Sequence, residues 1–81
     1  MKVYYYNFWI DRIENLLQNN ALEYPDLKGA ILKYLSLARP WPDKAINLIK
    51  NYIPIEVLDE TAKTDNGIRM NLELARKKNL L

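Results

Sequence analysis

Near the N-terminus, apolar side chains recur every three or four residues, which is the spacing of an α-helix with one buried face. This stripe consists of Tyr6, Trp9, Ile10, Ile13, Leu16 and Leu17. The pattern predicts a helix that begins between Tyr5 and Asn7 and ends in the polar stretch 18–20. If Asn7 is the N-cap, residues 2–6 lie outside this helix, and their Val-Tyr-Tyr-Tyr sequence suits a short extended strand.

Two further helices are marked by the same local signal, an aromatic residue followed by proline and aspartate. Proline suits the first helical position, and aspartate in the first turn complements the positive end of the helix dipole. These helices are predicted over residues 25–38 and 42–52. The former has a wide apolar face, which indicates a central position in the fold. That face comprises Leu27, Ala30, Ile31, Tyr34, Leu35 and Ala38, with Leu32 and Leu37 beside it.

The C-terminal part of the chain contains a proline break and a polar turn. Pro54 separates the third helix from a short fourth one, which carries Ile55, Leu58 and Ala62 on one face. Residues 63–67 have the composition of a turn, and a last helix follows them. We therefore predict an all-α fold: a small bundle of four to five short helices in a single domain, residues 1–81. The first helix is expected to pack on a hairpin of the second and third, with the last helix closing the core.

The residue types exclude most kinds of catalytic or metal chemistry. The chain has no cysteine and no histidine, so it lacks common zinc ligands and cannot form a disulfide. Its hydroxyl groups outside tyrosine belong to Ser36, Thr61 and Thr64, and no histidine can activate them. We expect no enzyme activity, no metal and no cofactor. The absence of cysteine fits a reducing compartment, and cytoplasm is the predicted localisation.

Five of the nine aromatic residues lie within residues 4–9, which is more apolar surface than a small domain leaves in water. Helical spacing places Tyr6 and Trp9 in the buried stripe but leaves Tyr4, Tyr5 and Phe8 unexplained. These three are candidate partner-binding residues. Trp41, between Pro40 and Pro42, is a fourth candidate, because tryptophan is common among binding hot spots. The alternative, which we favour, is that Trp41 folds back over the end of the helical hairpin.

Charged residues offer a second, weaker candidate site. The last helix and the turn before it are the most basic part of the chain, with Lys63, Arg69, Arg76, Lys77 and Lys78. Glu73 lies four residues from both Arg69 and Lys77 and is expected to neutralise one of them. The net charge is only +2, whereas a nucleic-acid-binding domain usually shows a basic stripe. The carboxylates of Glu56, Asp59 and Glu60 share one helical face, which is expected to be solvated.

By elimination, the sequence favours a non-catalytic protein-interaction module, such as a small regulator, inhibitor or assembly subunit. It is expected to bind a protein partner through apolar and aromatic surface. Homodimerisation is the simplest such use, because oligomerisation supplies stability that a single small core lacks. The alternative is a small dimeric DNA-binding or transcription-regulating protein that uses the basic C-terminal helix. A membrane partner is not expected, because the polar face of the first helix is slightly acidic.

Overall fold

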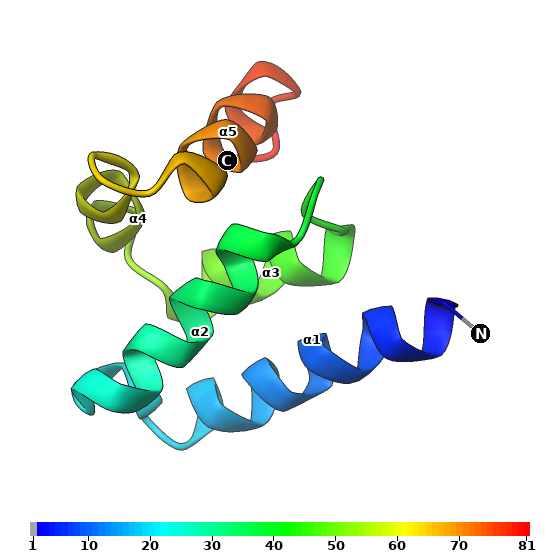
Figure 1. The fold of residues 1–81 in the computed structure, drawn as a ribbon, viewed down its shortest axis with the longest axis vertical. Coiled ribbons are helices and arrows are strands. Elements are labelled where there is room, and N and C mark those ends of the chain that lie inside the picture. The colour runs from blue at the N-terminus through cyan, green and yellow to red at the C-terminus, as the bar shows by residue number, and fades with distance from the viewer. Residues whose placement is uncertain (1) are drawn as a thin grey trace.

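The computed structural model describes the backbone of residues 2–81 and the side chains of residues 8–81. The fold is all-α, as predicted (Figure 1). Its five α-helices are α1 (Lys2–Gln18), α2 (Pro25–Leu37), α3 (Asp43–Tyr52), α4 (Ile55–Ala62) and α5 (Asn66–Lys77). One turn of 3-10 helix, η1 (Ala21–Glu23), joins α1 to α2. The described backbone contains no β-strand.

The helix boundaries agree with the sequence pattern at the prolines and differ from it at the N-terminus. Pro25 is the first residue of α2, as predicted, and the helical conformation is interrupted at Pro54, before α4. By contrast, α1 begins at Lys2 and runs through Asn7, so both the later start and the extended segment 2–6 were wrong. The described backbone offers no strand for such a segment to pair with. A helix satisfies its peptide groups internally, which outweighs the few tenths of a kcal/mol that tyrosine and valine lose relative to good helix formers.

The helices pack in an order that the sequence did not show. In Figure 1, α1 lies along one side of the molecule, α4 and α5 lie at the opposite side, and α2 and α3 lie between them. The main packing partners of α2 are α5 and η1, followed by α1. Helix α3 packs on α1, and α4 packs on α5. The second and third helices do lie in the middle of the fold, as expected, but they do not pack against each other as a hairpin. The connection bends at residues 39–40, and α3 beyond it packs on α1 instead of along α2.

The core is a single cluster of buried side chains to which all five helices contribute. The predicted stripe of α1 supplies Ile10, Ile13 and Leu17, all at most 5% exposed, with Trp9 and Leu16 partly buried beside them. The fully buried side chains of the other helices include Ile31, Leu35, Ile49, Leu58 and Ile68. The side chain of Tyr6 lies outside the described residues. The position of α1 against the core is thus the one that its apolar spacing predicts.

Trp41 belongs to this core. Its side chain is 5% exposed, and its indole Nε1 donates a hydrogen bond to the carbonyl oxygen of Leu35 at 2.8 Å. The expectation that Trp41 is an exposed partner-binding anchor was wrong, and the alternative, that it folds back over the end of α2, is confirmed. Folding back buries a large aromatic surface and provides a hydrogen-bond donor for a carbonyl at the end of α2, to which the helix itself supplies none.

The same helix end receives a second side chain, from α5. Asn71 is 2% exposed, and its Nδ2 donates to the carbonyl oxygens of Leu35 at 3.1 Å and of Ala38 at 2.6 Å. The carbonyl of Leu35 thus accepts hydrogen bonds from both Trp41 and Asn71. Because buried carbonyl groups are costly to leave unpaired, these contacts fix α5 against the C-terminal end of α2.

A second polar contact joins α2 to the start of α5. Asp65 is the N-cap of α5, and its Oδ1 accepts hydrogen bonds from the Ile68 amide at 2.9 Å and the Ser36 hydroxyl at 2.7 Å. These two bonds, with the Gly67 amide and the charge of Arg39, hold the pKa of Asp65 below its usual value. The predicted turn 63–67 is shorter than expected, because Asn66 and Gly67 already belong to α5.

Gly67 lies at the closest approach of the two helices. A Cβ atom on Gly67 would lie 2.3 Å from the carbonyl oxygen of Ser36 and 2.6 Å from its Oγ. Only a residue without a side chain fits there.

Candidate protein-binding surface

The predicted partner-binding residues of the N-terminus fall on α1. Phe8 is 64% exposed and, with Arg12 and Asn15, lines a shallow hollow on the outer side of that helix. Helical spacing in the sequence had already placed Phe8 outside the buried stripe of α1. The side chains of Tyr4 and Tyr5 lie outside the described residues. Phe8 is therefore the one member of this aromatic group whose exposure the structure establishes.

A second exposed apolar stripe lies on α2. Tyr34 is 36% exposed and Leu37 is 71% exposed, and with Leu27 and Ala30 they follow each other at spacings of three, four and three residues. The sequence pattern assigned Leu27, Ala30 and Tyr34 to the same buried face as Ile31 and Leu35, and this assignment was wrong. The apolar arc of α2 is wider than the area that α1 and α5 cover. Ile31 and Leu35 are buried, and Leu32 and Ala38 are partly buried against the core. The exposed members are Leu27, Ala30, Tyr34 and Leu37.

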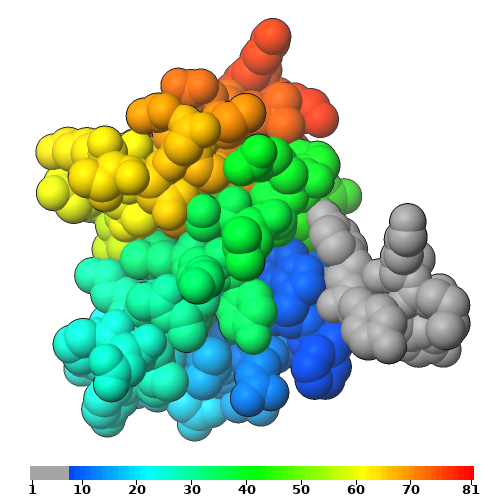
Figure 2. Space-filling model, in the orientation of Figure 1, coloured from blue at the N-terminus to red at the C-terminus, as the bar shows by residue number. Residues whose placement is uncertain are grey.

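An aromatic pair connects this stripe to α1. The rings of Trp9 and Tyr34 stack with centroids 6.1 Å apart and an angle of 12° between their planes. Figure 2 shows the surface of α1 directly beside the C-terminal end of α2 at this position. Stacked rings of this kind contribute about 0.5–1.5 kcal/mol beyond the area they bury. The pair therefore keeps both rings in place at the boundary between α1 and α2.

Two hollows flank the ridge formed by Tyr34 and Leu37. One, of about 370 Å³, is lined by Trp9, Tyr34, Leu37, Ala38 and Arg39. The other, of about 290 Å³, is lined by Ala30, Lys33, Tyr34 and Leu37. We call the residues that line these two hollows the α1–α2 surface. Neither hollow is lined by a carboxylate, and each contains one cationic side chain, Arg39 or Lys33.

The two cations are not used in ion pairs within the part of the chain with described side chains. The ion pairs there are formed by Lys44 with Asp11 and Glu14, Lys63 with Glu60, and Arg76 with Asp59. Lys33 and Arg39 are both exposed. Arg39 contributes to the low pKa of Asp65 only as the last of its causes. The positive charge at the edge of the α1–α2 surface is therefore largely available to a ligand.

The basic residues of the C-terminal helix are differently arranged. Lys63 Nζ lies 3.0 Å from Glu60 Oε2, and Arg76 Nη2 lies 2.9 Å from Asp59 Oδ1. Arg69 donates to the side chain of Asn66. These partners come from the start of α5 and from the carboxylates of α4, which the sequence analysis assigned to a solvated face. Glu73, the expected partner, forms no ion pair with any described side chain.

Lys77 and Lys78 remain exposed at the end of α5, at the opposite end from Lys63. Since two of the five basic side chains are paired with carboxylates, this helix offers no continuous run of free positive charge.

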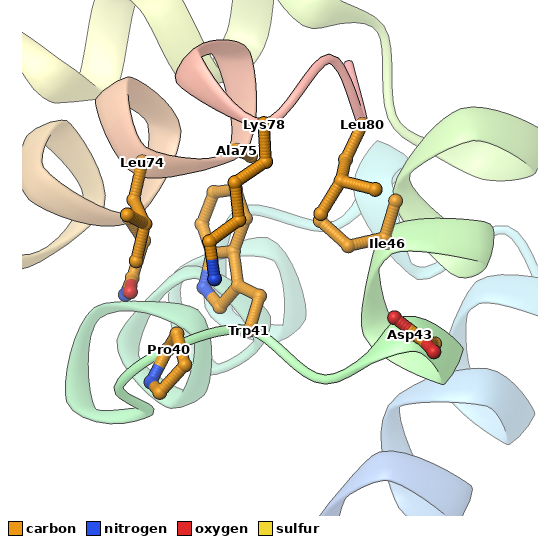
Figure 3. Close-up of a pocket in the computed structure, with 9 residues that line it drawn as sticks. Pro40, Trp41, Asp43, Ile46, Leu74, Ala75, Lys78 and Leu80 are labelled. Atoms are coloured by element: carbon orange, nitrogen blue, oxygen red, sulfur yellow. The ribbon is translucent and has the colours of Figure 1, made fainter.

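A further hollow, of about 230 Å³, lies between the α2–α3 connection and the C-terminal end of α5. Figure 3 shows the side chain of Lys78 extending beside the indole of Trp41, with Leu80 and Ile46 on one side and Pro40 below. The indole N–H is already bonded to Leu35, and the charged groups of the lining, Asp43 and Lys78, have opposite signs. This hollow lies where these elements pack together, and it is a weaker candidate binding site than the α1–α2 surface.

The hydroxyl groups considered in the sequence have structural partners. Ser36 donates to Asp65, and Thr61 Oγ1 donates to the carbonyl oxygen of Val57 at 2.8 Å. Among the described residues, no group of three or more acidic side chains is placed to hold a metal ion. No helix in that part of the chain combines the length and the apolar character needed to span a bilayer. Comparison with known proteins gave no significant match to a family model, a curated protein or a solved structure.

Proposed function

We propose that this chain is a non-catalytic protein-interaction module that binds its partner through the α1–α2 surface. The observation that supports this most directly is the exposure of Leu37 and Tyr34 beside the Trp9 ring, on a helix that buries only Ile31 and Leu35 in the core. Such a cluster of aromatic and aliphatic side chains is typical of the centre of a protein interface. A regulator, an inhibitor and an assembly subunit all work by contacts of this kind.

The size of the molecule sets how much surface a partner would use. A stable interface covers about 800 Å² on each partner. The chain exposes 5635 Å² in total, so such an interface would occupy about one seventh of it. The α2 stripe alone is too narrow for this area, and Trp9 of α1 extends it. We therefore propose an interface that spans both helices, in the cytoplasm, where a chain without cysteine requires no oxidising environment.

Self-association remains one way to use this surface. A two-fold interface brings identical patches together, so the free cations of one copy would approach those of the other. This cost favours a different protein as the partner, and light scattering over a range of concentrations separates the two cases. The DNA-binding alternative predicts measurable binding to DNA that falls steeply with salt. No arrangement of the basic residues described above favours it.

The proposal is tested with peptide ligands selected on the folded chain. The probe is a displayed library of 16-residue helical peptides with leucines fixed at helical spacing and all flanking positions randomised. Leu37→Gln should weaken the selected peptides at least tenfold, because burying a leucine contributes about 1.5–3 kcal/mol. The matched control is Met70→Gln, since Met70 is 45% exposed on α5, away from this surface. Peptides that bind independently of Leu37, together with a chain that is monomeric at every concentration, would refute the proposal.

A further inference from the structure

The free charges of the α1–α2 surface are all positive, and this narrows the chemistry of its partner. Lys33 lines the hollow on one side of the Tyr34–Leu37 ridge, and Arg39 lines the hollow on the other side. The rest of both linings is apolar or aromatic, apart from the hydroxyl group of Tyr34. A ligand that fills both hollows therefore meets one cation on each side of an apolar ridge.

We infer that the occupant is an amphipathic helical segment of another protein, with acidic residues on both sides of its apolar stripe. This inference rests on the proposed function. The apolar side chains of the segment enter the two hollows, and its carboxylates reach Lys33 Nζ and the Arg39 guanidinium. A helix in a groove is a common mode of peptide recognition, and complementary charges at the rim select the partner and its orientation.

The spacing of the two cations fits this occupant. Lys33 lies one turn before the end of α2, and Arg39 lies two residues beyond that end. At a rise of about 1.5 Å per residue, Lys33 lies roughly 6 Å before the end of α2, and Arg39 lies in the non-helical segment just beyond that end. Carboxylates four to six residues apart on a bound helix span a similar length. Arginine also holds a carboxylate in a two-pronged geometry, which would fix one end of the segment.

A second copy of this chain fits the surface less well. A two-fold axis would set the same rim against itself, so Lys33 and Arg39 of each copy would lie near cations of the other. The acidic groups of α1 cannot relieve this, because Asp11 and Glu14 are already engaged by Lys44 of α3. The Asp11 hydrogen bond is the main reason that the pKa of Lys44 is raised. The partner must supply the negative charge.

The test compares the charge of peptides selected on two forms of the chain. The library described above is selected on the natural chain and on Lys33→Glu/Arg39→Glu, with thermal unfolding confirming that both are folded. Peptides from the natural chain should carry Asp and Glu at the flanking positions, and those from the double variant should carry Lys and Arg. Acidic peptides should bind the double variant about tenfold more weakly, because exposed pairs contribute up to about 1 kcal/mol each and are replaced by repulsion.

Two controls keep the charge argument separate from folding and from net charge. Lys50→Glu/Lys77→Glu makes the same change in net charge at exposed positions of α3 and α5 and should alter peptide affinity less than twofold at 0.15 M salt. Lys33→Glu alone leaves the α2–α3 connection intact and should produce about half of the effect on a logarithmic scale.

Each outcome decides a different claim. Flanking charges that are random, or that do not change between the two forms, would overturn the acidic partner while leaving the proposed function in place. Leu37-independent peptides with a dimer that Leu37→Gln dissociates would identify a second copy as the occupant and overturn this inference alone. Leu37-independent peptides with a monomeric chain would overturn both.

Discussion

The two glycines of the chain provide a matched test of the packing of α2 on α5. Gly67 lies in the first turn of α5, where a Cβ would be 2.3 Å from the carbonyl oxygen of Ser36. Gly29 lies in α2, and a Cβ there would meet nothing within 4 Å. Alanine is favoured over glycine in helix propensity, by about 1 kcal/mol inside α2 and by less in the first turn of α5. Beyond this difference in propensity, the comparison of Gly67→Ala with Gly29→Ala measures the contact between the helices.

The magnitude follows from the distances. Ordinary contact with Cβ begins at 3.4 Å, so α5 must move by about 1 Å away from a backbone atom that cannot rotate aside. Overpacking of this kind costs about 1–3 kcal/mol. The movement also lengthens the hydrogen bond between Ser36 and Asp65, a further cost of about 1 kcal/mol. We expect Gly67→Ala to lower the free energy of unfolding by about 1–3 kcal/mol, whereas Gly29→Ala raises it by about 0.5–1 kcal/mol.

The assay is thermal and urea unfolding followed by circular dichroism at 222 nm. For a domain of this size, 1 kcal/mol corresponds to a change of about 4–8 °C in Tm. Gly67→Ala should therefore lower Tm by about 4–24 °C, and Gly29→Ala should raise it by about 2–8 °C. Ser36→Ala in the Gly67→Ala background should not restore stability, because the closest atom is the backbone oxygen. If both alanine variants were more stable than the natural chain, the close approach of α2 and α5 would be wrong.

Acid should remove the contribution of Asp65 to stability. The pKa of Asp65 is lower in the folded chain than in the unfolded one. Its stabilisation is therefore complete above the unfolded pKa of about 3.9 and is lost as the pH falls through the folded pKa. In urea unfolding at several pH values, the stability difference between the natural chain and Asp65→Asn should be largest near neutral pH and shrink in acid; a constant difference would contradict the assigned hydrogen bonds. Trp41→Phe should lower the free energy of unfolding by about 1–2 kcal/mol through loss of the bond to Leu35, and Trp41→Ala by about 3–5 kcal/mol. A Trp41→Phe variant as stable as the natural chain would show that the indole N–H makes no net contribution.

The helices themselves could be predicted because their signals are local. Apolar residues at helical spacing identified the buried face of α1, and the Pro25-Asp26 signal placed the start of α2 correctly. The Pro42-Asp43 signal predicted the start of α3 one residue too early, because Pro42 is the N-cap and Asp43 is the first helical residue. These features depend on backbone conformation within a few residues, so no knowledge of the tertiary structure was needed.

The candidate surface could not be predicted because it depends on which helices are neighbours. The sequence shows that α2 has a wide apolar arc, but only the positions of α1 and α5 decide that Ile31 is buried and Tyr34 is exposed. Asn71 was missed for the same reason, since it reads as an ordinary polar residue of an amphipathic helix and its partners lie on α2. Gly67 was missed as well, because glycine in the stretch 63–67 indicates a turn, and its contact with Ser36 depends on how α2 and α5 pack.

The shared carbonyl of Leu35 sets an order of events during synthesis. Trp41 follows Leu35 by six residues, whereas Asn71 follows it by 36. At a translation rate of about 5–20 residues per second, Trp41 leaves the ribosome within about a second of Leu35. Asn71 leaves it roughly two to seven seconds after Leu35. In that interval the end of α2 has only its nearby tryptophan as a cap. The donor from Trp41 is therefore available to this helix end before the donor from α5.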